Sequence, residues 1–174
     1  PHDRKRVCTA VFVSPEWLML DMGLSTEDQA LKQVCARLPE RLHQAAICCM
    51  SHWPEYNMWP LPGMEAVVRS QKEKGFGIYL CSNASLRLPE CFRDVIPAAE
   101  CFDGMLFSAQ VKCMKPQKEM YGHFFRRFHL VPEECFFIDD VSWNIDGAKA
   151  CGMDGYCFAD GDVEKLKAIL EGLG

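Results

Sequence analysis

The chain has 174 residues, 49% of them hydrophobic, which is enough to bury the core of one α/β domain with a small helical addition. Its net charge of −5 is mild and spread along the sequence, so the composition indicates neither a nucleic-acid nor a membrane-surface partner. No apolar stretch approaches the ~20 residues that a membrane helix needs, and residues 1–6 lead into no secretory signal. We therefore expect a cytoplasmic protein.

The sequence contains 11 cysteines, and most of them lie inside apolar runs. Because their number is odd and their neighbours are apolar, we expect reduced thiols in the core rather than disulfides. No C-x-x-C pair occurs, and the histidines have no metal-binding spacing, so a zinc site is not indicated.

Residues 1–56 have a helical pattern and are predicted to form a small helical domain. Ser14 and Ser25 are placed as helix N-caps. The four residues that begin at Ser25 resemble a capping box in which Asp28 replaces the usual glutamate, and residues 30–38 favour a helix. A proline-rich stretch then ends the pattern, and this break is the predicted domain boundary.

Residues 57–174 alternate between short apolar runs and helical segments. Because the runs lack strict alternation and are separated by helices, they predict a parallel sheet covered on both faces. The predicted strands are residues 77–81, 104–107, 135–138 and 155–158, and the predicted helices are residues 64–74, 116–128, 142–151 and 163–170.

Polar residues follow three of these strands. Ser82 and Asn83 follow the first, a loop after the second leads to Lys115, and Asp139 and Asp140 close the third. Ligands of such sheets bind beyond the carboxyl ends of the strands. The sequence therefore predicts that a hydroxyl, an ammonium and an acid pair share one edge.

This combination of groups is suited to phosphate chemistry. Two adjacent carboxylates repel each other unless a cation lies beside them, and hard oxygen ligands favour Mg²⁺. Taken alone, Asp140 is explained equally well as a helix cap, whereas Ser82 is better explained as a turn residue and Lys115 as a solvated surface charge. Their joint placement after three strands favours the site. Asn144 and Asp146 are interpreted as first-turn helix residues rather than ligands.

Three segments resemble motifs of the haloacid dehalogenase-like superfamily. LCSN at residues 80–83 resembles its second motif, KP at residues 115–116 its third, and FIDDVSWNIDGA at residues 137–148 its fourth. Response-regulator receivers use similar residue types, but there the acid pair comes first. The Asp-Asp motif followed by Asn-Ile resembles the branch of α-glucose-1-phosphate phosphatases and epoxide hydrolase phosphatase domains, rather than the metal-independent dehalogenases.

The resemblance implies a three-layer Rossmann-like core with a parallel sheet at residues 57–174 and a helical cap at residues 1–56. It implies a Mg²⁺-dependent phosphohydrolase that acts on a small phosphorylated metabolite through an aspartyl-phosphate. Asp140 would then ligate Mg²⁺ directly, and Asp139 would ligate it or hold a coordinated water. Lys115 would steady the nucleophile and the phosphate, Ser82 would donate to a phosphoryl oxygen, and Asn83 would contribute its backbone amide.

We do not find the superfamily's first motif, a strand followed by Asp-x-Asp that supplies the nucleophile and the general acid/base, in the N-terminal part of the sequence. Asp21 lacks a second Asp at the right spacing, and residues 7–13 are strand-like but precede only Ser14-Pro15-Glu16. Residues 10–23 resemble the middle of the cap instead. A segment before Pro1 is therefore expected to supply the strand, without which the sheet would have two unpaired inner edges. The alternative is a non-catalytic binding or regulatory protein.

Overall fold

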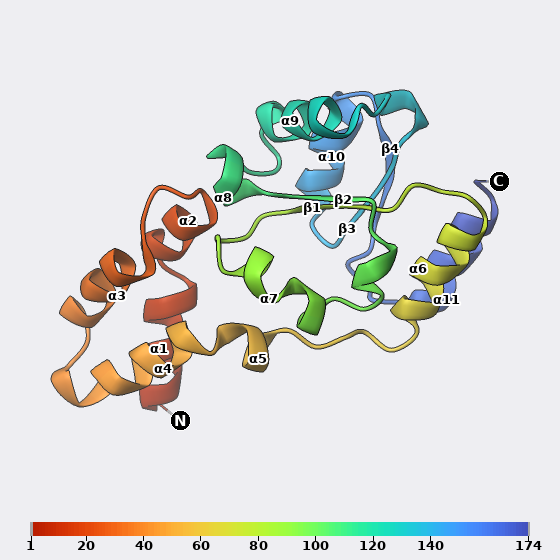
Figure 1. Ribbon diagram of the computed structural model, residues 1–174. Helices are drawn as coiled ribbons and strands as arrows, with labels where there is room; N and C mark the ends of the chain where they lie inside the picture. The colour runs from red at the N-terminus through yellow and green to blue at the C-terminus, as the bar shows by residue number, and fades with distance from the viewer. Residues whose placement is uncertain (1, 174) are drawn as a thin grey trace. The chain divides into compact units, whose positions relative to one another are not determined.

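The computed structural model describes residues 2–173 (Figure 1). The chain forms two compact units. Unit 1 contains the described residues up to Trp59, together with Asn83–Val95 and Phe107–Lys112. Unit 2 contains Pro60–Ser82, Ile96–Leu106 and the described residues from Cys113 onward.

Unit 1 is helical, as expected for its N-terminal part. Its elements are α1 (His2–Phe12), α2 (Pro15–Asp21), α3 (Glu27–Ala36), the 3-10 turn η1 (Glu40–Leu42), α4 (His43–Ser51), α5 (Trp53–Asn57), α7 (Leu88–Val95) and α8 (Ser108–Val111). Val7 and Val11 are buried in its apolar core. Because they are four residues apart, they lie on one face of a helix, so the strand alternative for residues 7–13 is wrong.

Of the two helix N-caps predicted for unit 1, one is confirmed and the other is wrong. Ser14 caps α2, since its hydroxyl accepts a hydrogen bond from the Trp17 amide at 3.2 Å. At α3 the N-cap is Thr26 rather than Ser25, and the capping box is completed by Gln29. The Gln29 side chain reaches back to the Thr26 amide at 3.1 Å, which the shorter side chain of Asp28 was expected to do.

Unit 2 contains the strands and their covering helices. The strands are β1 (Tyr79–Ser82), β2 (Gly104–Phe107, whose last residue falls in unit 1), β3 (Phe136–Asp139) and β4 (Asp154–Cys157). The helical elements are α6 (Met64–Glu73), η2 (Ala99–Cys101), α9 (Lys118–Phe128), η3 (Pro132–Glu134), α10 (Ser142–Ala150) and α11 (Val163–Glu171). All predicted strands and helices of this part of the chain are confirmed, with ends shifted by one or two residues.

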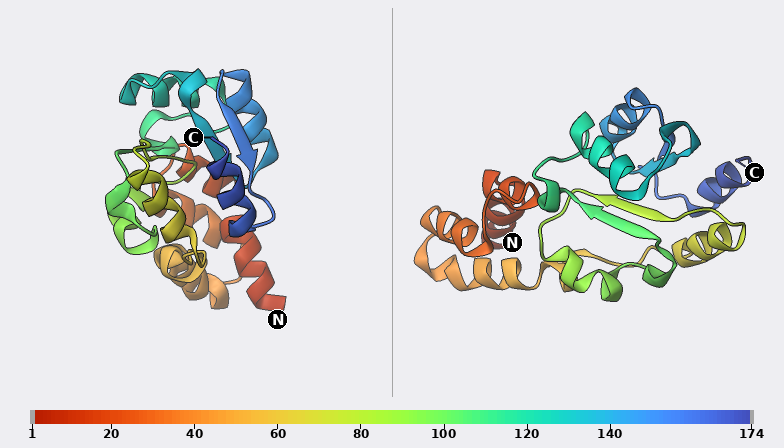
Figure 2. Two further views of the ribbon diagram at one scale, coloured as in Figure 1. Left: turned by 90° about the vertical axis from the view of Figure 1, so that its right-hand side faces the viewer. Right: turned by 45° about the horizontal axis from the view of Figure 1, so that its top comes forward.

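Strand β3 is covered on both faces. Phe136 packs against the cluster of α6 and α11, and Phe137 packs against the cluster of α9 and α10. Figure 2 shows the α6–α11 pair and the α9–α10 pair as separate helical layers. Neighbouring residues of a strand point to opposite faces, so this arrangement gives the three layers that the sequence predicts.

The strands form two pairs rather than one continuous sheet. Strand β3 lies parallel to β4, with Phe136 opposite Asp154 and Asp139 opposite Cys157, and β1 pairs with β2. Among residues 2–173 no further strand pairs with the other edge of β1 or of β3. One edge of β1 and one edge of β3 are therefore unpaired within the described residues.

The 11 cysteines are all free thiols, as expected. Burial is deepest at Cys81, where it raises the thiol pKa to about 11. Within the described part of the chain, no helix is both long and apolar enough to cross a bilayer.

Candidate active site at the carboxyl ends of β1 and β3

Lys115 and Asp139 form a buried ion pair in unit 2. The Lys115 Nζ lies 2.6 Å from Asp139 Oδ2, and only 9% and 6% of the two side chains are exposed. The same ammonium donates to the Cys81 carbonyl at 2.8 Å and lies 5.3 Å from the centre of the Phe137 ring. Lys115 therefore joins the end of β1 to the end of β3.

Asp139 is held by further donors on its other oxygen. Asp139 Oδ1 accepts hydrogen bonds from the Val141 amide and from the Asn144 side-chain nitrogen, both at 2.9 Å. A carboxylate with three such donors has a fixed orientation. Asp139 is thus oriented by its partners, and much of its acceptor capacity is used within the protein.

Asn144 is a functional candidate that the sequence interpretation missed. It is 5% exposed, and its backbone carbonyl accepts a 2.6 Å hydrogen bond from the Tyr121 hydroxyl, whose pKa is raised by burial. Its Oδ1 has no hydrogen-bond partner among residues 2–173. One signal could have indicated its position: Asn144 shares a helical stripe with the apolar residues Ile145 and Ala148, so it faces the interior.

Asp140 differs from Asp139 in exposure and in hydrogen bonding. Its side chain is exposed, and no donor in the described chain hydrogen-bonds to its carboxylate. Because Lys115 neutralises Asp139, Asp140 carries the uncompensated negative charge at this end of β3. The helix that follows does not use Asp140 as its N-cap, because Val141 occupies that position. The helix-cap interpretation of Asp140 is therefore wrong.

The structure brings together some of the predicted site residues. Lys115 and Asp139 are in contact, and Asp140 is the next residue in the chain. Ser82 ends β1, half-buried, immediately after the carbonyl that Lys115 contacts. Asn83 follows as the first residue of a segment of unit 1.

The donor set suits a hard divalent cation bound through few protein ligands. No group of three or more His, Cys, Asp or Glu side chains within residues 2–173 is arranged to hold a metal ion. Mg²⁺, however, is commonly held by only one or two carboxylates, with waters and a phosphate completing its coordination. The exposed carboxylate of Asp140 beside the oriented carboxylate of Asp139 fits that requirement.

A comparison with protein-family models identifies the family of this chain. Residues 55–152, more than half of the chain, match the family model described as haloacid dehalogenase-like hydrolase. The chain belongs to this family. The matched range contains Ser82, Lys115 and the Asp139-Asp140 pair, so all three predicted motifs lie within it.

Two curated proteins resemble the chain in sequence. The sesquiterpene phosphatase astK of Aspergillus oryzae is 29% identical over 97 residues, which cover 56% of this chain and 50% of that protein. The phosphorylated carbohydrates phosphatase of Thermotoga maritima is 33% identical over 70 residues, which cover 40% of this chain and 32% of that protein. The chain thus spans half or less of the length of these relatives.

Solved structures of the family confirm the fold. A HAD-like family hydrolase of Porphyromonas gingivalis superposes with a TM-score of 0.68 at 19% identity, covering 97% of this chain and 89% of that one. A HAD family enzyme of Bacteroides thetaiotaomicron, solved with magnesium and inorganic phosphate, gives 0.65 at 18% identity, covering 88% and 83%. At these identities the likeness establishes the Rossmann-like fold alone.

Proposed function

We propose that this chain forms part of a Mg²⁺-dependent phosphohydrolase that acts on a small phosphorylated metabolite. The observation that carries the proposal is the contrast between the two adjacent acids. Asp139 is buried against Lys115, whereas Asp140 is exposed and unpaired within the described chain. Such a pair supplies a fixed carboxylate and an available carboxylate at one strand end. Both curated relatives are named phosphatases, which supports a phosphate ester as the substrate.

Lys115 is proposed to bind a phosphoryl oxygen. Its ammonium already has carbonyl and carboxylate partners, so its position is set before any substrate arrives. A preorganised cation of this kind stabilises the charge that develops on a transferring phosphoryl group without reorganising during the reaction. Ser82, at the end of β1, is proposed to donate to the same group, and Asn83 to contribute its backbone amide.

Asp140 is proposed as the direct ligand of Mg²⁺, with Asp139 as a second ligand or as the acceptor for a coordinated water. When bound, the ion would neutralise phosphate charge and hold the substrate in place. The protein fixes the orientation of the carboxylate of Asp139. The Asn144 side chain and the Val141 amide hydrogen-bond to it, so Asp139 does not have to rearrange when the ion binds.

The nucleophile is proposed to come from a strand outside the described residues. The free edges of β1 and β3 are those between which the first strand of this fold lies, and this strand carries the Asp-x-Asp motif in the family that the sequence resembles. Residues 1–56 are proposed to act as the cap. One observation favours the non-catalytic alternative: the Asp-x-Asp that follows a strand within residues 2–173 comes after β4, and there Asp160 pairs with Lys165 and Asp162 caps α11.

The test is a phosphatase screen of the natural full-length protein with sugar phosphates, prenyl phosphates and Mg²⁺. Asp140→Asn should lower turnover at least about 100-fold, because one metal ligand loses its charge. The matched control is Asp146→Asn, which removes an exposed carboxylate from α10, the helix that follows Asp140. Equal turnover by the Asp140 variant and the wild type would contradict the metal role. Mg²⁺ binding without hydrolysis of any phosphate would favour the non-catalytic alternative.

A further inference from the structure

Tyr121, on helix α9, is the largest fully buried side chain among the described residues. Its hydroxyl donates a 2.6 Å hydrogen bond to the Asn144 carbonyl on α10, and its ring meets the Phe137 ring of β3 edge-to-face. Asn144 contacts Asp139, and Phe137 lies beside the Lys115 ammonium. Tyr121 therefore adjoins one supporting residue for each member of the buried ion pair.

The first connection runs through the start of α10. Asn144 lies in the first turn of this helix, and its side-chain nitrogen donates to Asp139 Oδ1 at 2.9 Å. The Tyr121 hydroxyl binds the backbone carbonyl of the same asparagine. A hydrogen bond to the backbone fixes the place from which the side chain extends, so the donor reaches the carboxylate in one geometry. The orientation of Asp139 thus depends on the Tyr121 hydroxyl.

The second connection runs through the Phe137 ring. The Lys115 Nζ lies 5.3 Å from the centre of this ring, which is within the range of a cation–π contact. The Tyr121 ring meets the same ring at an interplanar angle of 88°, with 6.0 Å between the centroids. Such an edge-to-face pair is favoured by the charge distribution of the two rings and restricts how Phe137 can turn. Both partners of the ion pair are therefore supported from Tyr121.

The close approach of Tyr121 to α10 requires a glycine. A Cβ atom at Gly147 would lie 3.1 Å from the Tyr121 hydroxyl oxygen and 2.9 Å from the Pro116 carbonyl oxygen. Pro116 is the residue directly after Lys115, so α10 packs closely against both the hydroxyl and the Lys115 segment. The hydroxyl thus belongs to a tight contact in which a small displacement of α10 would be felt at the ion pair.

The Tyr121 hydroxyl is a stable donor. Burial raises the pKa of this hydroxyl, so it stays protonated at neutral pH. The Asn144 carbonyl can only accept, so the direction of the hydrogen bond is fixed. Replacement of the tyrosine by phenylalanine would remove this donor and keep the ring against Phe137. The contribution of the hydroxyl can therefore be measured separately from that of the ring.

We infer that Tyr121 is a positioning residue of the proposed phosphohydrolase. Its hydroxyl holds Asn144, and through it the Asp139 carboxylate, in the orientation that Mg²⁺ binding requires. Its ring supports Phe137 beside the Lys115 ammonium. The inference rests on the proposed function, because it gives Tyr121 a role in binding the ion. It predicts an effect of the hydroxyl on the acid pair rather than on the whole fold.

The experiment compares Tyr121→Phe with the wild type in the natural full-length protein. Mg²⁺ is titrated while NMR follows the side-chain amide signal of Asn144, and Asp140→Asn identifies the binding that belongs to the acid pair. Tyr121→Phe should raise the Kd for Mg²⁺ about 3- to 10-fold, the effect of one lost hydrogen bond in the support of a ligand. The control is Tyr79→Phe, which removes the hydroxyl of a tyrosine that packs against the other aromatic residues of α9 and should leave the Kd unchanged.

Hydrogen exchange in the metal-free protein separates positioning from a general loss of stability. The Val141 amide donates to Asp139 Oδ1 at 2.9 Å, so its protection reports on the orientation of that carboxylate. In Tyr121→Phe this amide should exchange at least about 5-fold faster. The Val67 amide, which donates to the Gly63 carbonyl at 3.2 Å in the α6 layer, should change by less than about 2-fold.

The outcomes distinguish failure of the inference from failure of the proposed function. If the wild type binds no Mg²⁺, or if Asp140→Asn binds it as tightly as the wild type, the proposed function fails and the inference fails with it. If the wild type binds Mg²⁺ through the acid pair and Tyr121→Phe binds it equally tightly, the inference alone is overturned. Equal acceleration of exchange at Val141 and Val67 also overturns it, because the hydroxyl would then stabilise the fold as a whole.

Discussion

Lys115 and Asp139 lie 2.6 Å apart in an ion pair that is more than nine-tenths buried. Removing one partner of such a pair leaves the other as an uncompensated buried charge, which typically costs about 3–5 kcal/mol. We therefore expect Lys115→Met to lower the free energy of unfolding by about 3 kcal/mol, in addition to any loss of activity. Chemical denaturation of both proteins measures this difference.

The double variant Lys115→Met with Asp139→Asn separates the charge effect from simple loss of packing. Because both charges are removed together, the double variant should be more stable than Lys115→Met alone by at least about 1 kcal/mol. If the two substitutions lower the free energy of unfolding additively, the loss of stability in Lys115→Met does not come from an unpaired Asp139 charge.

The sequence predicted the elements around this pair well, for a physical reason. The strand at residues 104–107 coincides with β2, and the Asp139-Asp140 pair begins at the last residue of β3, because short apolar runs between helices have few other ways to be buried. Ser25 and Thr26 were harder to separate. Both residue types are common N-caps, with Ser slightly preferred, and the Gln29 side chain selects Thr26 only in the folded geometry.

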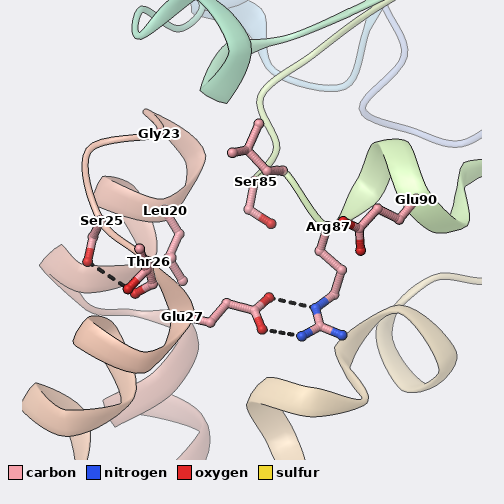
Figure 3. Close-up of a pocket in the computed structure, with 9 residues that line it drawn as sticks. Leu20, Gly23, Ser25, Thr26, Glu27, Ser85, Arg87 and Glu90 are labelled. Atoms are coloured by element: carbon pink, nitrogen blue, oxygen red, sulfur yellow. Dashed lines mark hydrogen bonds and ion pairs between the residues drawn. The ribbon is translucent and has the colours of Figure 1, made fainter.

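The ion pair between Glu27 and Arg87 (Figure 3) could not be predicted from local pattern. Glu27 and Arg87 are 60 residues apart in the chain, and nothing in either segment indicates the other. The same holds for α7, which begins at Leu88 after a loop-like stretch and has Pro89 in its first turn. Asn144 lies in the first turn of α10, as predicted, but its hydrogen bond to Asp139 was not predicted because Asp139 lies on the preceding strand rather than on the same helix.

Asn144 gives a second prediction. Asn144→Ala removes one of the donors to Asp139 Oδ1, so we expect a loss of about 1–2 kcal/mol in the free energy of unfolding. Asn144→Asp should cost more, because a second carboxylate would replace a donor that lies 2.9 Å from Asp139. Denaturation at pH 7 measures both, and equal stability of the two variants would contradict the role of Asn144 as a donor to Asp139.

Gly23 gives a third prediction with an internal control. A Cβ atom at this position would lie 2.2 Å from the Ala109 carbonyl oxygen, in addition to the cost of a φ of +65°. Gly161 has a φ of +66° with nothing within 4 Å of the added atom. Gly161→Ala should therefore cost about 1 kcal/mol, and Gly23→Ala at least about 2 kcal/mol more. Similar melting temperatures for the two variants would show that the Ala109 carbonyl moves away freely.

Asp21 gives a prediction about pH. Burial raises the pKa of the Asp21 carboxyl to about 7, and a hydrogen bond from the Ser85 amide opposes this only in part. The folded state therefore holds the proton more tightly than the unfolded chain, whose Asp pKa is about 3.9. The contribution of Asp21 to stability is fully present below pH ~4 and is lost as the pH rises through about 7.

Asp21→Asn removes this titration while keeping an acceptor for the Ser85 amide. Wild type and variant should be equally stable at pH 4, and at pH 8 the variant should be more stable by an amount on the order of 2 kcal/mol, because solvent partly screens the half-buried carboxyl. Denaturation curves between these pH values measure the difference, and carbon NMR of the Asp21 carboxyl should give a midpoint near 7. Stability profiles that run parallel across this range would mean that the carboxyl titrates alike in the folded and unfolded states, so that burial exerts no net effect on it.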